Sequence, residues 1–295
     1  MNQILLDDLD PDQRRDLDNI RAAAGRIWAR PLHRYYTDHT VAHSERISAL
    51  LDGLTTGVMA TPKRLLPAEI FVLLAAAYLH DIGMQNERFA GGDLDQIREE
   101  HHEQSAEMIY AVFEDPANAL SIPLTRDPTL VEGVALVSKG HRKVNLAGPE
   151  YEPLAYRGQT LRLRLLAALL RFGDELDIDQ RRVDLELMKL ATLPLISQLH
   201  WWKCYYVSGV NIADEYIRVN YRFPQCRPDY ERLIIPLVEG DIRSRHAALE
   251  PLFRAEAVKV ALGSSQIRAL RLVDPLPAEV EALAWQQLGG KEARG

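Results

Sequence analysis

Apolar residues recur at helical spacing through most of residues 1–180. Such spacing is typical of helices that bury one face. In five of these segments a histidine or a carboxylate lies on the same helix face as the apolar residues, which we call the apolar stripe. We therefore expect the helices to bury ionisable groups. The predicted helices cover residues 7–30, 39–54, 67–81, 94–114, 130–141 and 161–177.

The pattern changes beyond about residue 184. Ile217, Val219, Tyr221 and Phe223 alternate with polar residues, which indicates a half-buried strand after a hairpin turn at Asp214-Glu215. We also expect a loop at 145–158, helices at 185–193, at 228–262 with an interruption at Pro251 and from Pro277, and a strand at 269–273. The predicted fold is mainly α, with a helical domain at residues 1–184 and a small C-terminal α+β lobe at 185–295 packed on it.

The ionisable residues on the predicted stripes have side chains that ligate metal ions. Imidazole and carboxylate ligands without thiolate suit Mn, Fe, Mg, Co or Zn. Burying several such groups is costly unless something pairs them, and a metal ion does so. The set is large enough for two divalent ions if Asp81 bridges them. The predicted ligands are His43, His80, Asp81, His101, His141 and Asp174.

Two further histidines adjoin this set. His39 lies one turn before His43, and we consider it an additional ligand, a residue that orients a ligand, or a helix cap. His102 follows His101, and the periodicity of the 94–114 helix does not decide which of the two faces the core.

Several of these segments resemble motifs of the HD-domain metal-dependent phosphohydrolases. Leu-His-Asp-Ile-Gly at 79–83 resembles the signature of that family, 43–47 resembles its first histidine helix, and 172–177 resembles its closing aspartate helix. Residues 101–109 are similar to a further histidine helix of the two-metal branch, which includes the HD-GYP phosphodiesterases. That similarity places His101 at the ligand position and matches His141 to part of a later His-His pair. It implies an HD-type helical bundle.

The sequence also departs from the two-metal pattern. Gly140 stands where these enzymes often carry another histidine, Met84 replaces a common lysine, and the Gly-Tyr-Pro loop is missing. A specificity for cyclic-di-GMP is therefore not supported.

The resemblance implies hydrolysis of a phosphoester by water that two metal ions activate. We expect a phosphodiesterase or phosphohydrolase that acts on a small phosphorylated substrate, a nucleotide or a cyclic nucleotide. Asp81 would be catalytic, and Lys139 and Arg142 beside His141 would bind phosphate, although a solvated basic helix end explains these two cations equally well. The alternatives are a nucleotide-sensing or partner-binding module with little turnover, and a single-strand nuclease.

Composition limits the expected partners and the cellular compartment. The 295 residues carry a formal net charge of -7, which disfavours duplex nucleic acid and anionic membranes as partners. The two cysteines and the absence of a signal-peptide pattern at the N-terminus favour a cytoplasmic protein. We expect no membrane association, and a protein partner or a homo-oligomer would use the C-terminal lobe.

Overall fold

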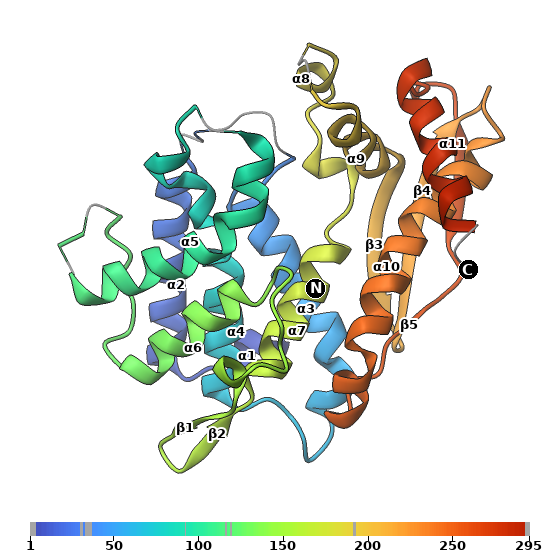
Figure 1. Cartoon of the computed structure of the whole chain (residues 1–295). Coiled ribbons are helices and arrows are strands. Elements are labelled where there is room, and N and C mark those ends of the chain that lie inside the picture. Colours follow the sequence, from blue (N-terminus) through green and yellow to red (C-terminus); the bar gives the residue numbers. More distant parts are fainter. Residues whose placement is uncertain are drawn as a thin grey trace. The chain divides into compact units, whose positions relative to one another are not determined.

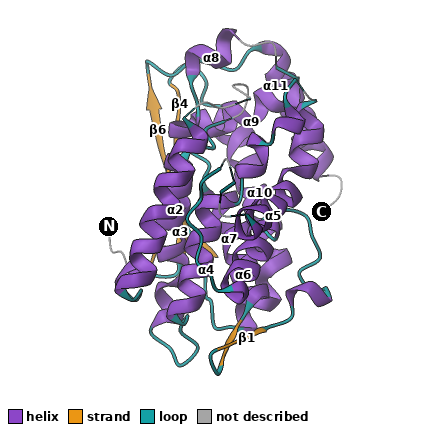
Figure 2. Cartoon of the chain, turned by 90° about the vertical axis from the view of Figure 1, so that its left-hand side faces the viewer, coloured by secondary structure: helices purple, strands orange, loops and turns teal. Residues whose placement is uncertain are grey.

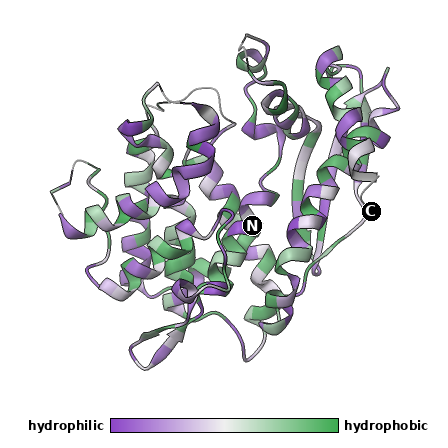
Figure 3. Cartoon of the chain, viewed as in Figure 1, coloured by the Kyte–Doolittle hydropathy of each residue, from purple (hydrophilic) through white to green (hydrophobic). Residues whose placement is uncertain are grey.

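The computed structural model describes residues 4–29, 32, 37–91, 93–115, 117–118, 120–190 and 193–292. Helices dominate this part of the chain, and strands occur as a short hairpin and one small sheet (Figure 2). Most helices carry both hydrophobic and hydrophilic residues, as helices with one face in a core do (Figure 3). The prediction of a mainly α fold with a small α+β part is confirmed.

The described chain forms two compact units. The first contains residues up to Asp174, apart from 37–38, together with Leu249–Lys259. The second contains residues 37–38, Glu175–Ala248 and the residues from Val260 on. Our domain boundary at residue 184 and the packing of the lobe on the helical domain stay predictions.

The first unit is a helical bundle (Figure 1). Its helices are α1 (Ile4–Asp7), α2 (Pro11–Trp28), α3 (Val41–Met59), α4 (Pro67–Leu79), α5 (Leu94–Glu114), α6 (Pro128–Lys139) and α7 (Leu163–Leu176), with α7 ending beyond the unit. Single 3-10 turns, η1 (Ile82–Gln85), η2 (Glu87–Phe89) and η3 (Pro149–Tyr151), lie between them.

Helix α4 is the core of this bundle. Each of its residues from Ala68 to Leu79 is buried, and it contacts α2, α3 and α6. The stretch Pro67–Gln85 is apolar and long enough to span a membrane by composition, yet 94% of its most apolar window lies inside the protein. Its burial is that of a core helix.

One charged group enters this core near the start of α4. Glu69 is fully buried, and its carboxylate accepts hydrogen bonds from the backbone N–H of Leu66 and of Arg162 and from the Arg162 guanidinium. The guanidinium also binds the Glu256 carboxylate at 3.1 Å. The pair fixes the start of α7 against α4. Because each partner neutralises the charge of the other, the pair buries no isolated charge.

The second unit combines helices with a four-stranded sheet. Its elements are η4 (Gln180–Arg182), α8 (Leu185–Leu190), α9 (Leu195–Tyr206), β3 (Val207–Ala213), β4 (Tyr216–Pro224), most of α10 (Tyr230–Ala255), β5 (Ala261–Leu262), β6 (Gln266–Leu270) and α11 (Ala278–Glu292). Strand β4 pairs antiparallel with β3 and parallel with β5 and β6. The predicted strand and hairpin turn are confirmed, because Ala213 pairs with Tyr216 across Asp214-Glu215.

Several local predictions were wrong. The helix predicted to reach residue 262 ends at Ala255, before β5, and the strand predicted at 269–273 is β6 at Gln266–Leu270. Helix α3 begins after the N-cap Thr40, whose side chain accepts a hydrogen bond from Ala42, so His39 precedes the helix. Helix α10 continues through Pro251. The predicted loop at 145–158 contains η3 and β1 (Leu154–Tyr156), which forms a hairpin with β2 (Gln159–Leu161).

Candidate metal centre

The two carboxylate oxygens of Asp81 face different groups of histidines. Oδ2 lies 3.0 Å from Nε2 of His80 and 3.6 Å from Nε2 of His43. Oδ1 lies 3.3 Å from Nε2 of His101 and 3.4 Å from Nε2 of His141. One carboxylate therefore stands between two sets of nitrogen ligands, as a bridge between two sites requires.

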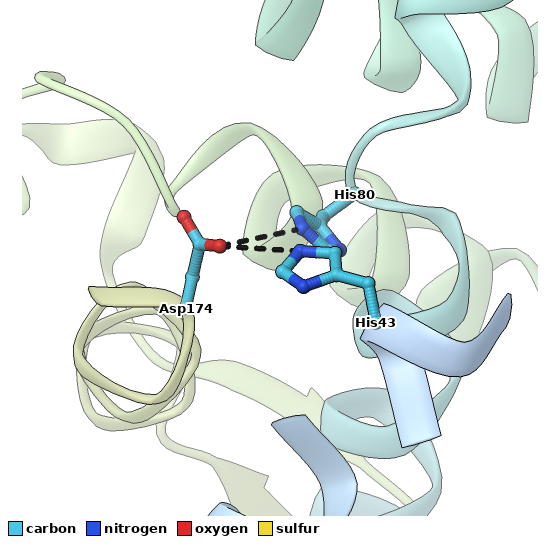
Figure 4. A group of neighbouring side chains, drawn as sticks. All are labelled: His43, His80 and Asp174. Carbon is cyan, nitrogen blue, oxygen red and sulfur yellow. Dashed lines mark ion pairs between the residues drawn. The ribbon is translucent and has the colours of Figure 1, made fainter. Parts of the chain in front are cut away.

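Asp174 completes the first of these sets (Figure 4). From α7, its Oδ1 lies 3.3 Å from Nε2 of His43 on α3 and 3.9 Å from Nε2 of His80, which caps α4. The potential ligand atoms of these three residues all lie within 4.8 Å of one another, and the same holds for His80, Asp81 and His141. The structure thus brings all six predicted ligands together.

Backbone carbonyls orient three of the imidazole rings. Nδ1 of His80 lies 3.0 Å from the carbonyl oxygen of Ala77, Nδ1 of His101 2.9 Å from that of Ile97, and Nδ1 of His141 2.6 Å from that of Ser138. A carbonyl can only accept a hydrogen bond, so Nδ1 donates in each case. Each neutral ring then presents the lone pair of Nε2 to the centre, which is the arrangement typical of metal-binding histidines.

The charges of the centre fit a cation. Burial alone would raise the pKa of Asp81, but the surrounding imidazoles of His80, His101, His141 and His43 hold this pKa well below its usual range. Burial likewise opposes ionisation of Asp174, and the neighbouring His43 and His80 outweigh it and lower its pKa. Burial lowers the pKa of His141 to about 4. At neutral pH both carboxylates are ionised and His141 is neutral.

A metal ion would supply a partner for the ligand nitrogens of three histidines at the centre. Nε2 of His101 and Nε2 of His141 lie 3.1 Å apart with both lone pairs directed into the centre. Within the described residues, the buried Nε2 of His80 has no hydrogen-bond partner of acceptable geometry. Buried nitrogen and oxygen donors in this arrangement fit divalent metal ions.

A close contact between α5 and the turn after Asp81 builds this geometry. The Ser105 hydroxyl accepts a hydrogen bond from the Gly83 backbone N–H at 2.8 Å and lies 2.5 Å from the carbonyl oxygen of His80. A side chain on Gly83 would overlap the carbonyl oxygen of His101. Glycine at position 83 therefore allows α5 to bring His101 against the turn that carries His80 and Asp81.

Arg171 likewise links two segments that carry predicted ligands. From α7 its guanidinium donates hydrogen bonds to the carbonyl oxygens of Gly140 at 2.9 Å and Val144 at 3.0 Å. These bonds tie the segment around His141 to the helix that carries Asp174. Sequence reasoning missed both Ser105 and Arg171. Ser105 had a signal, because it lies one helical turn after His101, whereas nothing in the sequence around Arg171 indicates its partners.

Replacing Ser105 with alanine should weaken metal binding by about 10- to 100-fold, the usual effect of losing a group that orients a ligand. The substitution removes the link between α5 and the turn and leaves the buried N–H of Gly83 unsatisfied. Isothermal titration with Mn²⁺ measures the change. Ser48→Ala is the matched control, since the Ser48 hydroxyl donates to a carbonyl within α3. Equal effects of the two substitutions would contradict the assigned role.

The remaining candidates lie around this centre. His39 is further out, with Nε2 3.9 Å from Oδ2 of Asp81, and its part in metal binding stays a prediction. Lys139 forms an ion pair with Glu150 at 3.2 Å. Arg142 donates a hydrogen bond to the carbonyl oxygen of Arg98 at 3.1 Å. The phosphate-binding role of these two cations is likewise still a prediction.

The structure explains why position 140 lacks a histidine. Gly140 caps α6, and a side chain there would come within 2.5 Å of Cβ of Ala167 on α7. Close packing of α6 against α7 leaves no room for another ligand at this position.

A helical bundle that gathers these histidines and aspartates at the His-Asp turn is an HD-type domain. The chain belongs to the HD-CE family, whose model matches residues 33–255. The match confirms the resemblance to HD-domain proteins and, with the buried His/Asp groups, indicates a metal-dependent hydrolase. A comparison with curated proteins finds no match.

Proposed function

We propose that this protein is a metal-dependent phosphohydrolase or phosphodiesterase that hydrolyses a phosphoester bond of a nucleotide or cyclic nucleotide in the cytoplasm. The observation that carries the proposal is the position of Asp81, whose two oxygens face separate sets of histidines. A site of this form suits two divalent ions sharing one carboxylate.

The two sets assign ligands to each ion. His43, His80, Asp174 and Oδ2 of Asp81 would hold one ion. The second would be held by His101, His141 and Oδ1 of Asp81. Bound ions of this kind supply Lewis-acid activation of water and stabilise charge on phosphate oxygens.

The residues of the chain contribute orientation and charge. The carbonyls of Ala77, Ile97 and Ser138 hold three imidazoles in the ligating tautomer, so no proton has to leave them before an ion binds. We further propose that Arg142 and Lys139 attract the phosphate group of the substrate. Arg142 has donors beyond the one that binds the Arg98 carbonyl, and guanidinium groups match phosphate oxygens well.

The test is a turnover assay with identified products. The purified protein is loaded with Mn²⁺ and incubated with a panel of nucleotides, cyclic nucleotides and cyclic dinucleotides, and elemental analysis gives its metal content. We expect multiple turnovers of at least one substrate and no reaction after EDTA treatment. Tight nucleotide binding without turnover across several metals would favour a nucleotide-sensing module instead. Cleavage of single-stranded DNA or RNA in place of nucleotides would favour a nuclease.

A further inference from the structure

His102 lies beside the metal centre without belonging to either set of ligands. It follows His101 on α5, and its ring centroid is 6.0 Å from that of His101 and 6.4 Å from that of His141. The residue is only 9% exposed. In the described part of the chain, its buried Nδ1 has no hydrogen-bond partner. An unsatisfied buried polar atom destabilises a protein, so this nitrogen offers a hydrogen-bonding position to a ligand.

The charged residues near His102 indicate whether a ligand there would be an anion or a cation. The half-buried Arg142 has no carboxylate partner among the described residues, and its only hydrogen bond there goes to the Arg98 carbonyl. Arg142 follows His141 in the chain, and its guanidinium binds the carbonyl oxygen of Arg98, one helical turn before His102 on α5. The neighbouring Glu103 is exposed. Lys139 is paired with Glu150, so Arg142 supplies the unbalanced charge. A further cation would be repelled here, whereas an anion would be stabilised.

We propose that His102 and Arg142 form an oxyanion-binding subsite that holds a phosphate group next to the His101 and His141 side of the metal centre. This inference rests on the proposed function for the identity of the anion. Neutral imidazole carries one N–H, and Nδ1 of His102 donates it to a phosphate oxygen. The planar guanidinium of Arg142 supplies further donors together with the charge. The two side chains come from different segments, α5 and the turn after α6, so the subsite also joins these segments when it is filled.

The experiment measures binding of inorganic phosphate by isothermal titration, on the Mn²⁺-loaded protein and after EDTA treatment. His102→Leu and Arg142→Gln should each weaken phosphate binding by about 10-fold or more, since a hydrogen bond to a charged group is lost. His102→Asn should stay within about threefold of the unchanged protein, because the asparagine amide can place a donor near the position of Nδ1. Lys143→Gln is the matched control, because Lys143 carries the same charge as its neighbour Arg142 but is exposed. It should leave phosphate binding unchanged.

Each outcome decides the proposal. Unchanged phosphate binding in either His102→Leu or Arg142→Gln would overturn it, as would a loss of Mn²⁺ in His102→Leu, which would make His102 a metal ligand. Absence of phosphate binding to the unchanged protein would also overturn it. If His102→Leu does not fold, the comparison of Arg142→Gln with Lys143→Gln decides. Phosphate binding that depends on His102, in a protein without hydrolytic turnover, would overturn the proposed function and support the subsite.

Discussion

Replacing Asp81 with asparagine should remove the bound metal and lower hydrolysis by more than about 100-fold. Losing a group that merely orients a ligand costs about 10- to 100-fold in metal affinity or activity, and Asp81 is itself the residue that faces both ligand sets. Asparagine has nearly the same shape as aspartate but no charge, so the packing of the turn is kept while the bridge is weakened. Metal content by inductively coupled plasma mass spectrometry and initial rates of hydrolysis measure the two effects.

The control for this substitution is Asp95→Asn on α5, where the side chain is 77% exposed. We expect unchanged metal content and rates in this variant. The melting temperatures of both variants in EDTA should match that of the unchanged protein within a few degrees, which separates loss of metal from loss of fold. An Asp81→Asn protein that kept its metal and its turnover would contradict the bridging role.

Replacing Gly83 with alanine should disrupt the fold and the centre together. The added methyl group would overlap the carbonyl oxygen of His101 and lie 2.5 Å from the backbone nitrogen of Ser105. Both atoms belong to the backbone of α5, so the overlap is relieved only if the helix moves and takes His101 with it. We expect a loss of about 3 kcal/mol in the free energy of unfolding, at the upper end for overpacked cores. Urea unfolding of the metal-free protein measures it.

The same variant should lose binding on the His101 side of the centre. Titration with Mn²⁺ should show reduced affinity or fewer sites. Gly289→Ala on α11 is the matched control, since nothing lies within 4 Å of the added methyl group. Alanine is the better helix former by about 1 kcal/mol, so this control should be neutral or slightly stabilising. A Gly83→Ala protein as stable as the control, with full metal binding, would show that α5 does not depend on this close approach.

The helical ligands were predictable because spacing determines which residues share a helix face. The bounds predicted for α5, 94–114, are those that the structure shows. Its two stripes could not be separated by periodicity, and the structure shows why: His101 and His102 are both buried. Of these two histidines, His101 is the one that contacts Asp81, with its Nε2 3.3 Å from Oδ1, because α5 packs closely against the turn after Asp81. That contact is tertiary, and no local pattern encodes it.

The errors also have physical reasons. Helix α10 continues through Pro236 and Pro251, although an interior proline costs about 3 kcal/mol. Buried side chains such as Leu237 and Val238 provide the packing that offsets this cost. The β1–β2 hairpin was missed because its strands have three residues each, too few for a visible alternation. Its turn nevertheless has a local signal, the Arg157-Gly158 pair, in which both residues take positive φ.

The ligands that meet at Asp81 come from five segments of the chain, from His43 to Asp174. Each of the two proposed ions would cross-link several of these segments, which are far apart in the unfolded chain. Its binding free energy would add to the stability of the fold by about 2.7 kcal/mol when the free ion is present at 100 times its dissociation constant. Copies of the protein made in metal-starved cells would therefore unfold and be degraded sooner, and the supply of metal would govern how long the protein lasts.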